Sequence, residues 1–316
     1  MEAGTWSLGV SAMYFLRRLI FLIPTLLIIS FLAFALVRVA PGSPFDKERK
    51  PASPEIERAL KAKYHLDEPL WKQYMRYLAD LARGDFGPSM KYRNHTVNDI
   101  IRQGLPVSMT LGLGAFLFAQ GIGIPVGFYS AVRRGRRVDY IVSFLALLAI
   151  CIPAFVVGPL LIMVFAFKMN WLPAGLWESP KHMILPVIAL GLYFAGRISR
   201  LMREGMSGIL HSEFITTARA KGLSETATLV KHAFRLAVLP VVSYSGPLLA
   251  DLLTGSFVVE SIFGIPGIGV FLVNSSLNRD YSMVVGLVVL YAVLLLVLNL
   301  LVDLSYTLLD PRVKYE

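Results

Sequence analysis

One short segment combines residue types that suit binding to another protein. Residues 213–223 read EFITTARAKGL, with Ser212 just before them and Gly222 close to their end. Serine at an N-cap accepts a backbone hydrogen bond, and glycine adopts the left-handed conformation that often ends a helix. The sequence therefore predicts a short helix here. Its small residues, Ala218 and Ala220, would let a partner's backbone approach closely.

The candidate docking residues are those of this helix and the turn after it: Glu213, Thr216, Thr217, Ala218, Arg219, Ala220, Lys221, Gly222 and Leu223. Arg219 and Lys221 supply donors for acidic or carbonyl groups. The alternative for the whole segment is a solvated amphipathic loop. The alternative for Arg219 and Lys221 is that their positive charge only sets membrane orientation. A second helix capped by Ser224 should follow and merge with an apolar segment. A helical hairpin between two membrane spans favours docking.

Motifs for catalysis, nucleotide binding and metal binding are missing. The sequence has no Gly-Lys dipeptide, which excludes a Walker A phosphate loop and ATP binding through one. The five histidines are scattered without metal-ligand spacing, so we predict no metal site and no catalytic residue. The glycine-rich stretch at 264–269 follows an apolar segment rather than a strand. It predicts a tight turn with positive φ rather than a nucleotide cradle.

Asp251 is an ionisable residue inside an apolar segment. Ionisable residues are rare in membrane spans and usually have a function there. We take Asp251, Tyr244 and Thr254 as candidates for lining a polar pathway. A membrane-embedded enzyme is an alternative. One aspartate without a carboxylate or histidine partner is a poor site for hydrolysis or proton relay, which argues against it.

The elements around these residues are membrane spans. The 316 residues are 55% hydrophobic and 16% charged, whereas soluble domains carry about 25% charged residues. This composition excludes a disordered chain and an ordinary soluble enzyme. A spanning helix needs about 20 apolar residues. Six segments meet this need: 19–39, 107–131, 140–167, 183–202, 238–259 and 281–301. In the second, Gly121, Gly123 and Gly127 are spaced for close helix packing.

The distribution of Lys and Arg predicts that both termini are cytoplasmic. Positive residues gather at the N-terminus, after the second and fourth spans and in the C-terminal tail: Arg17, Arg18, Arg133, Arg134, Arg136, Arg137, Arg197, Arg200, Arg203, Arg219, Lys221, Lys231, Arg235, Arg312 and Lys314. The two short loops on the other side hold only Lys168, Lys181 and Arg279. The net charge of +10 is therefore mainly a topology signal, and we predict no nucleic-acid partner.

These observations predict a simple organisation, in chain order: a cytoplasmic segment at 1–18, the first span at 19–39, an external helical segment at 40–106, and a transmembrane domain at 107–316 with a cytoplasmic coupling loop at 203–237. In the external segment, Ser53-Pro54 begins a predicted helix to about Tyr64. A second helix follows Pro69 and ends before Gly84. A solvated linker is the alternative reading of this segment.

Several motifs along almost the whole chain resemble those of the permease subunits of bacterial ABC importers for peptides, most closely the B-type permeases of oligopeptide systems. They are RRL at 17–19, APGSPF at 40–45, YHLDEPLWKQY at 64–74, GDFGPS at 84–89, TARAKGL at 217–223, LPVV at 239–242, GSFVVESIFGIPGIG at 255–269, NRDY at 278–281 and DPR at 310–312. The segment at 217–223 resembles the coupling loop of these importers, with Thr216 and Thr217 in place of its general Glu-Ala. Asp251 stands where the family has a small or apolar residue.

The resemblance implies an all-α, six-span bundle with the type I ABC importer permease fold, in the bacterial inner membrane. It implies a heteromeric importer with a second homologous permease, two cytoplasmic ABC ATPases and an external peptide-binding protein. ATP and magnesium would bind the ATPases, so this chain would be a pathway subunit without a cofactor and not an enzyme. Similar permeases carry dipeptides, glutathione, murein peptides or nickel complexes. A secondary transporter or channel is the alternative of another class, but it would usually show an internal repeat.

Overall fold

The computed structural model describes residues 3–39, 62, 64–92 and 94–309, with side chains described between residues 20 and 301. In this part the chain is helical, and its only β-pairing is an isolated bridge between Pro88 and Thr96. The chain divides into two compact units. Unit 1 is Met1–Pro106 with Gly267–Glu316, and unit 2 is Val107–Pro266.

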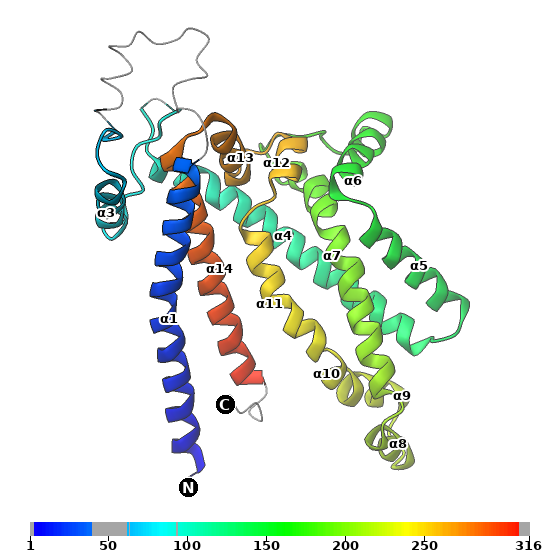
Figure 1. Cartoon of the computed structure of the whole chain (residues 1–316). Helices are drawn as coiled ribbons and strands as arrows, with labels where there is room; N and C mark the ends of the chain where they lie inside the picture. The colour runs from blue at the N-terminus through cyan, green and yellow to red at the C-terminus, as the bar shows by residue number, and fades with distance from the viewer. Residues whose placement is uncertain (1–2, 40–61, 63, 93, 310–316) are drawn as a thin grey trace. The chain divides into compact units, whose positions relative to one another are not determined.

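Unit 1 is built on two long helices that run side by side, α1 (Ala3–Val39) and α14 (Tyr281–Leu309) (Figure 1). It also contains α3 (Leu70–Leu81), α13 (Ile268–Asn278) and the start of α4 (Val97–Val132). The helix predicted after Pro69 is confirmed as α3. The helix predicted from Ser53-Pro54 to Tyr64 falls almost wholly on residues 40–61 and 63, outside the described residues.

Two motif segments of unit 1 meet at one buried carboxylate. Asp280, in the NRDY segment, accepts a hydrogen bond from the Ser89 hydroxyl of the GDFGPS segment. The backbone amides of Met90 and Lys91 donate to the same carboxylate at 3.1 and 3.2 Å. A buried carboxylate needs such donors because its desolvation is otherwise costly. Asp280 therefore holds the loop before α4 against the loop before α14.

Unit 2 contains the rest of α4 and most of the remaining helices: α5 (Arg137–Cys151), α6 (Ala154–Leu161), η1 (Ile162–Lys168), α7 (Pro180–Ile209), α8 (Glu213–Ala220), α9 (Glu225–Ala227), η2 (Thr228–Ala233), α10 (Phe234–Ala237), α11 (Leu239–Leu253) and α12 (Phe257–Phe263). Its core packs α4 against α7. A Cβ added to Gly127 would lie 2.2 Å from the Ser199 carbonyl oxygen, and one on Gly123 would lie 2.8 Å from Ile198. Close packing is thus confirmed at these two glycines and is wrong for Gly121, which faces open space.

Four of the six predicted spans are single helices long and apolar enough to cross a membrane: Ile20–Val39, Val97–Val132, Pro180–Ile209 and Tyr281–Leu301. The predicted span over 140–167 is not one straight helix, because the chain bends by 103° between α5 and α6. Pro153 causes the break. It has no amide hydrogen to donate, and it keeps Ile152 extended at ψ 118°.

The predicted span over 238–259 is also not one helix. It ends at Leu253, because Gly255 adopts φ +89° and a separate helix, α12, follows. Next to α12, Gly264 has φ +62°, as predicted for the glycine-rich turn. With each bent helix pair taken as one span, up to seven segments qualify.

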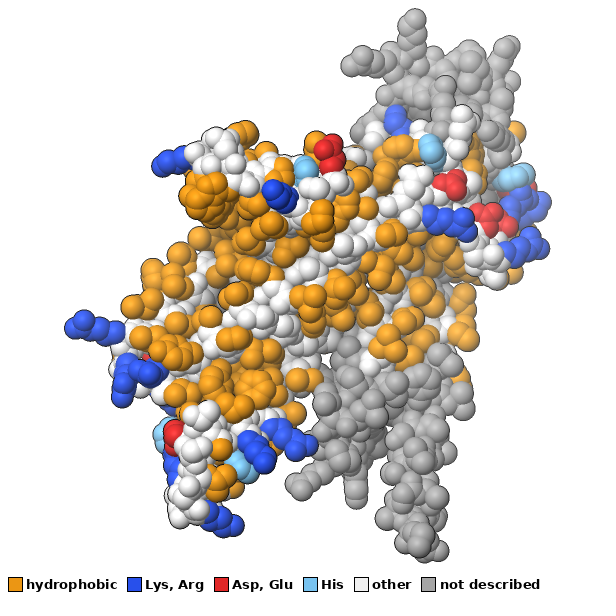
Figure 2. All heavy atoms as spheres, turned by 180° about the vertical axis from the view of Figure 1, so that it is seen from behind, with side chains coloured by type: hydrophobic (Ala, Val, Ile, Leu, Met, Phe, Trp, Pro, Cys, Tyr) orange, Lys and Arg blue, Asp and Glu red, His pale blue; other side chains and the backbone are white. Residues whose placement is uncertain are grey.

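The outer surface of α5 is apolar. Ile141, Phe144 and Leu145 are each more than half exposed. Figure 2 shows hydrophobic side chains covering much of one face, with Lys and Arg toward its margins. Lipid tails solvate such side chains, whereas water does not. The exposed face of α5 therefore fits contact with the bilayer.

Candidate coupling hairpin and polar pocket

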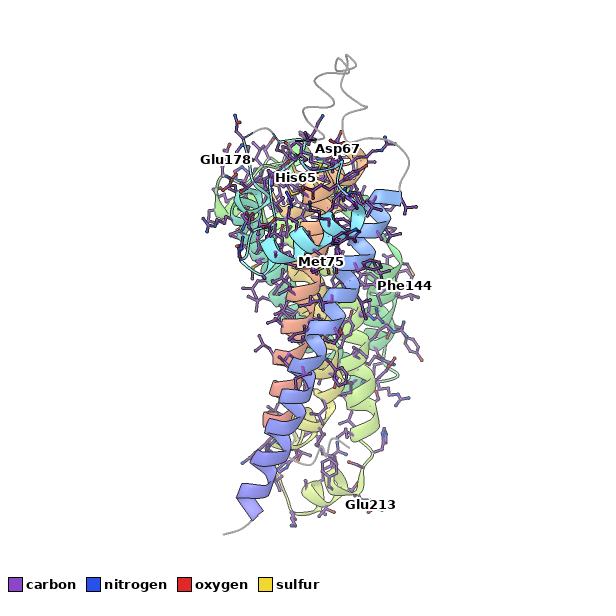
Figure 3. The ribbon with its side chains drawn as sticks, turned by 60° about the vertical axis from the view of Figure 1, so that its left-hand side comes forward. His65, Asp67, Met75, Phe144, Glu178 and Glu213 are labelled. Carbon is purple, nitrogen blue, oxygen red and sulfur yellow. The ribbon has the colours of Figure 1, made fainter. Side chains whose placement is uncertain are left out.

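The candidate coupling hairpin comprises residues 212–237, from the N-cap of α8 to the end of α10. Glu213, at its start, lies at the opposite end of unit 2 from Glu178 (Figure 3). The predicted boundaries of the first helix are confirmed: Ser212 is the N-cap residue, and Gly222 has φ +80° just after the helix. The Ser212 hydroxyl, however, donates to the Ile209 carbonyl rather than accepting a bond from the helix. Ser224 caps α9 as predicted, accepting from the Ala227 amide at 3.3 Å.

The helix α8 presents one face to its own chain and the other to solvent. Ile215 is fully buried and Ala218 is 9% exposed, so these two residues anchor the hairpin. The other predicted docking residues are exposed: Glu213, Thr216, Thr217, Arg219, Ala220, Lys221, Gly222 and Leu223. Ala218 is therefore not on the free surface. Phe214, which the sequence reasoning missed, is 41% exposed beside them.

Arg219 joins the two helices of the hairpin. Its guanidinium donates to both carboxylate oxygens of Glu225, at 3.1 and 2.7 Å. This hydrogen bonding raises the pKa of Arg219, which stays charged. Arg219 is thus already paired within the chain, whereas Lys221 forms no ion pair with any described residue. Of the two cations singled out from the sequence, Lys221 is the freer donor.

Close packing joins the hairpin to α7, and an ion pair joins α7 to α5. Gly205 of α7 lies so close to α10 that an added Cβ would be 2.3 Å from the Ala237 carbonyl oxygen. Arg203, two residues before Gly205 on α7, binds Asp139 of α5 at 2.6 Å and so joins α7 to α5. Close backbone packing and a buried ion pair limit independent movement of the joined elements. A displacement of the hairpin would therefore carry α7 with it.

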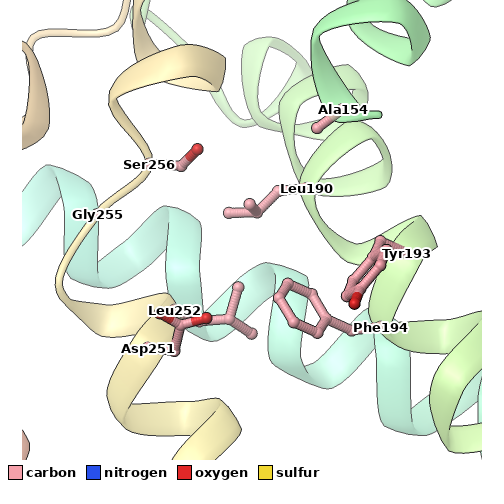
Figure 4. Close-up of a pocket in the computed structure, with 8 residues that line it drawn as sticks. All are labelled: Ala154, Leu190, Tyr193, Phe194, Asp251, Leu252, Gly255 and Ser256. Atoms are coloured by element: carbon pink, nitrogen blue, oxygen red, sulfur yellow. The ribbon is translucent and has the colours of Figure 1, made fainter. Parts of the chain in front are cut away.

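A pocket of about 280 Å³ lies between α7, α11 and the break that precedes α12 (Figure 4). Of the three candidate pathway residues, only Asp251 lines it directly. Tyr244 lies two turns back on α11, with its ring 5.0 Å from the Arg197 guanidinium. The Thr254 hydroxyl donates to the Asp251 carbonyl at 2.7 Å, so Thr254 closes the end of α11 instead. Tyr193 and Ser256, which the sequence reasoning missed, also line the pocket.

A fully buried glutamate supports the break in front of α12. The Ser108 hydroxyl donates to Glu260 at 2.7 Å, and a Cβ on Gly255 would lie 2.8 Å from the same carboxylate oxygen. Only glycine fits between this carboxylate and the turn. The GSFVVE segment therefore has a structural role, since Gly255 and the buried Glu260 set the turn between α11 and α12.

Among the described residues, no group of three or more His, Cys, Asp or Glu side chains could hold a metal ion. The candidate site combines an exposed helical hairpin with a largely apolar pocket that Asp251 lines in the same unit. Helices long and apolar enough to span a membrane carry this site, which is typical of a membrane protein.

Comparisons with known proteins agree. The model of the family "binding-protein-dependent transport system inner membrane component" matches residues 123–315. The oligopeptide transport system permease protein OppB of Haemophilus influenzae is 46% identical over 304 residues, covering 96% of this chain and 99% of that protein. OppB of Escherichia coli K12 is also 46% identical with the same coverage. The dipeptide transport system permease protein DppB of Bacillus subtilis is 45% identical over 303 residues, covering 96% of this chain and 98% of that protein.

The inward-facing structure of the MetNI methionine ABC transporter has a TM-score of 0.54 and 17% identity, covering 67% of this chain and 96% of that chain. This similarity confirms the expected ABC importer permease fold. The protein is a membrane permease subunit. It belongs to the family of inner membrane components of binding-protein-dependent transport systems.

Proposed function

We propose that this chain forms half of the translocation pathway of an ATP-binding-cassette importer for peptides, with oligopeptides as the main cargo. Relatives in oligopeptide systems that match over 96% of the chain carry this conclusion. The DppB relative, at 45% identity, keeps dipeptides as the second candidate cargo. Neither comparison favours a secondary transporter or channel.

The proposed assembly contains a second homologous permease, two cytoplasmic ABC ATPases and an external peptide-binding protein. The missing Walker A motif supports an assembly in which the ATPase subunits bind ATP and magnesium. In that assembly this chain is not an enzyme. The positive residues of the hairpin and the N-terminus support an orientation with both termini in the cytoplasm. In this orientation the coupling hairpin faces the ATPases.

We further propose that the exposed residues of the hairpin seat in an ATPase subunit. Closure of the ATPase pair around nucleotide would then move α7 through its contact with the hairpin at Gly205, and α5 with α7 through the Arg203–Asp139 pair. Asp251 and Tyr244 would line the pathway that this movement opens and closes. Thr254, whose hydroxyl donates a hydrogen bond to the Asp251 carbonyl, would stabilise the end of α11 beside this pathway.

Reconstitution in proteoliposomes tests the function. The chain with its partners should take up labelled peptide only when ATP is present, and the chain alone should take up none. Uptake by the chain alone without ATP would overturn the proposal.

Gly222→Trp tests the docking surface, because Gly222 is exposed and an added Cβ meets no atom within 4 Å. Its φ of +80° strains any side chain, so the melting temperature is measured beside binding. We expect it to abolish co-purification of the ATPases. Unchanged co-purification would contradict the assignment. Ala218→Trp would not test the same surface, because Ala218 is buried against its own chain.

A further inference from the structure

Four polar side chains face one another across two helices of unit 2. Tyr193 and Arg197 lie one turn apart on α7, and Tyr244 and Asp251 lie two turns apart on α11. The Arg197 guanidinium lies 3.4 Å from the Tyr193 hydroxyl and 5.0 Å from the Tyr244 ring. The cluster thus combines one carboxylate, one guanidinium and two phenols.

The anionic end of this cluster opens into the pocket. Figure 4 shows Asp251 on the α11 wall and Tyr193 on the α7 wall, with Leu190 and Phe194 also lining the space. Aliphatic and aromatic walls lower the local dielectric constant. The field of a single carboxylate therefore reaches further there than in water.

Asp251 has no counter-ion within the part of the chain that the structure describes. Its side chain is exposed to the pocket, and it makes no ion pair with Arg197. The hydroxyl of Thr254 binds the backbone carbonyl of Asp251 and leaves the carboxylate free. An unpaired carboxylate beside low-dielectric walls attracts a cation, and aromatic faces add to that attraction.

We propose that this pocket is a transient binding site for the N-terminal ammonium group of the peptide as it passes through the pathway. Asp251 is the counter-ion, and the rings of Tyr193 and Phe194 form the opposite wall. Arg197, one turn along α7, repels the ammonium and so confines it to the Asp251 end. The inference rests on the proposed function, because every unmodified peptide that such an importer transports has an N-terminal ammonium group.

The test uses the complete transporter in proteoliposomes, with trialanine and acetyl-trialanine as cargo, each at a concentration that saturates the binding protein. Asp251→Asn should lower the rate of trialanine uptake about tenfold, as expected for the loss of roughly 1.4 kcal/mol of cation binding in the pathway. It should leave acetyl-trialanine uptake within about twofold, since that peptide has no ammonium group. Asp251→Glu should restore most of the trialanine rate.

Glu204→Gln is the matched control, because it removes one exposed carboxylate of α7 outside the pocket. It should leave both rates unchanged. Equal trialanine rates for Asp251→Asn and the wild type would overturn the binding site. A fall for both peptides that Asp251→Glu does not restore would overturn it as well, because it would indicate a structural role. No ATP-dependent uptake of trialanine by the wild-type assembly would instead contradict the proposed function.

Discussion

Arg203 holds both carboxylate oxygens of Asp139, with Nε at 2.6 Å and Nη2 at 2.9 Å. The Ser130 hydroxyl and the Gly135 amide donate to the same carboxylate at 2.7 and 3.0 Å. The Asp139 side chain is only 4% exposed, so all of these donors are needed. The pair fixes α7 to the start of α5 and to the turn between α4 and α5, at the end of unit 2 that carries the coupling hairpin (Figure 1).

Replacing Arg203 by Lys should lower the free energy of unfolding by about 3 kcal/mol, because lysine cannot form two parallel hydrogen bonds to a buried carboxylate. Thermal unfolding of the purified chain in detergent measures this. Arg200→Lys is the control: Arg200 lies 3.8 Å from Glu204, both are more than half exposed, and such pairs contribute under about 1 kcal/mol. Equal effects of the two substitutions would contradict the role given to Asp139.

Gly127→Ala should destabilise unit 2 by about 2 kcal/mol, because the added methyl group would crowd backbone atoms of α7, which can move only if the helix itself shifts. The added methyl group would meet the Ser199 carbonyl oxygen at 2.2 Å and Met202 at 2.9 Å. Gly121→Ala, on the same helix, meets nothing within 4 Å. It should be neutral or stabilise α4 by up to about 1 kcal/mol through helix propensity. Melting temperatures of the two variants would be compared, and a lower value for Gly121→Ala would count against the packing described.

Gly255→Ala and Gly264→Ala separate backbone strain from crowding. Both glycines have positive φ, so alanine costs about 1–2 kcal/mol at either position. At Gly255 the new Cβ also meets Glu260 at 2.8 Å and Ser108 at 3.2 Å, whereas at Gly264 the nearest atom is 4.0 Å away. Gly255→Ala should therefore lower the melting temperature more. If Gly264→Ala were equally harmful, the buried Glu260 would not determine the geometry of this break.

Phe214→Ser should weaken binding of the ATPase subunit at least about tenfold while the melting temperature stays unchanged, because an exposed aromatic side chain is a frequent anchor of protein interfaces. The neighbouring Ile215→Ser should instead lower the melting temperature, because Ile215 is fully buried. Pull-down of the ATPase together with thermal unfolding distinguishes the two. A Phe214→Ser variant that binds the ATPase normally would remove Phe214 from the docking surface.

Much of the site could be predicted locally. Ser212, Gly222 and Ser224 mark the hairpin because caps and turns depend on residues a few positions apart. The division of α8 into buried and exposed faces could not be read in the same way. Ile215 and Phe214 are adjacent apolar residues, and only the packing of α8 against its own unit decides which one is covered.

The sequence by itself determined that this chain has membrane-spanning segments and no Walker A phosphate loop, because hydropathy, charge placement and the missing Gly-Lys dipeptide are properties of composition and order. Its motif residues carried the resemblance to peptide permeases. The tertiary structure alone decided the contacts between distant segments. Arg203 reaches Asp139, Asp280 holds Ser89, and Asp251 shares a pocket with Tyr193. These contacts depend on how helices cross and where they break, and crossing geometry arises from the packing of whole helices rather than from any local pattern.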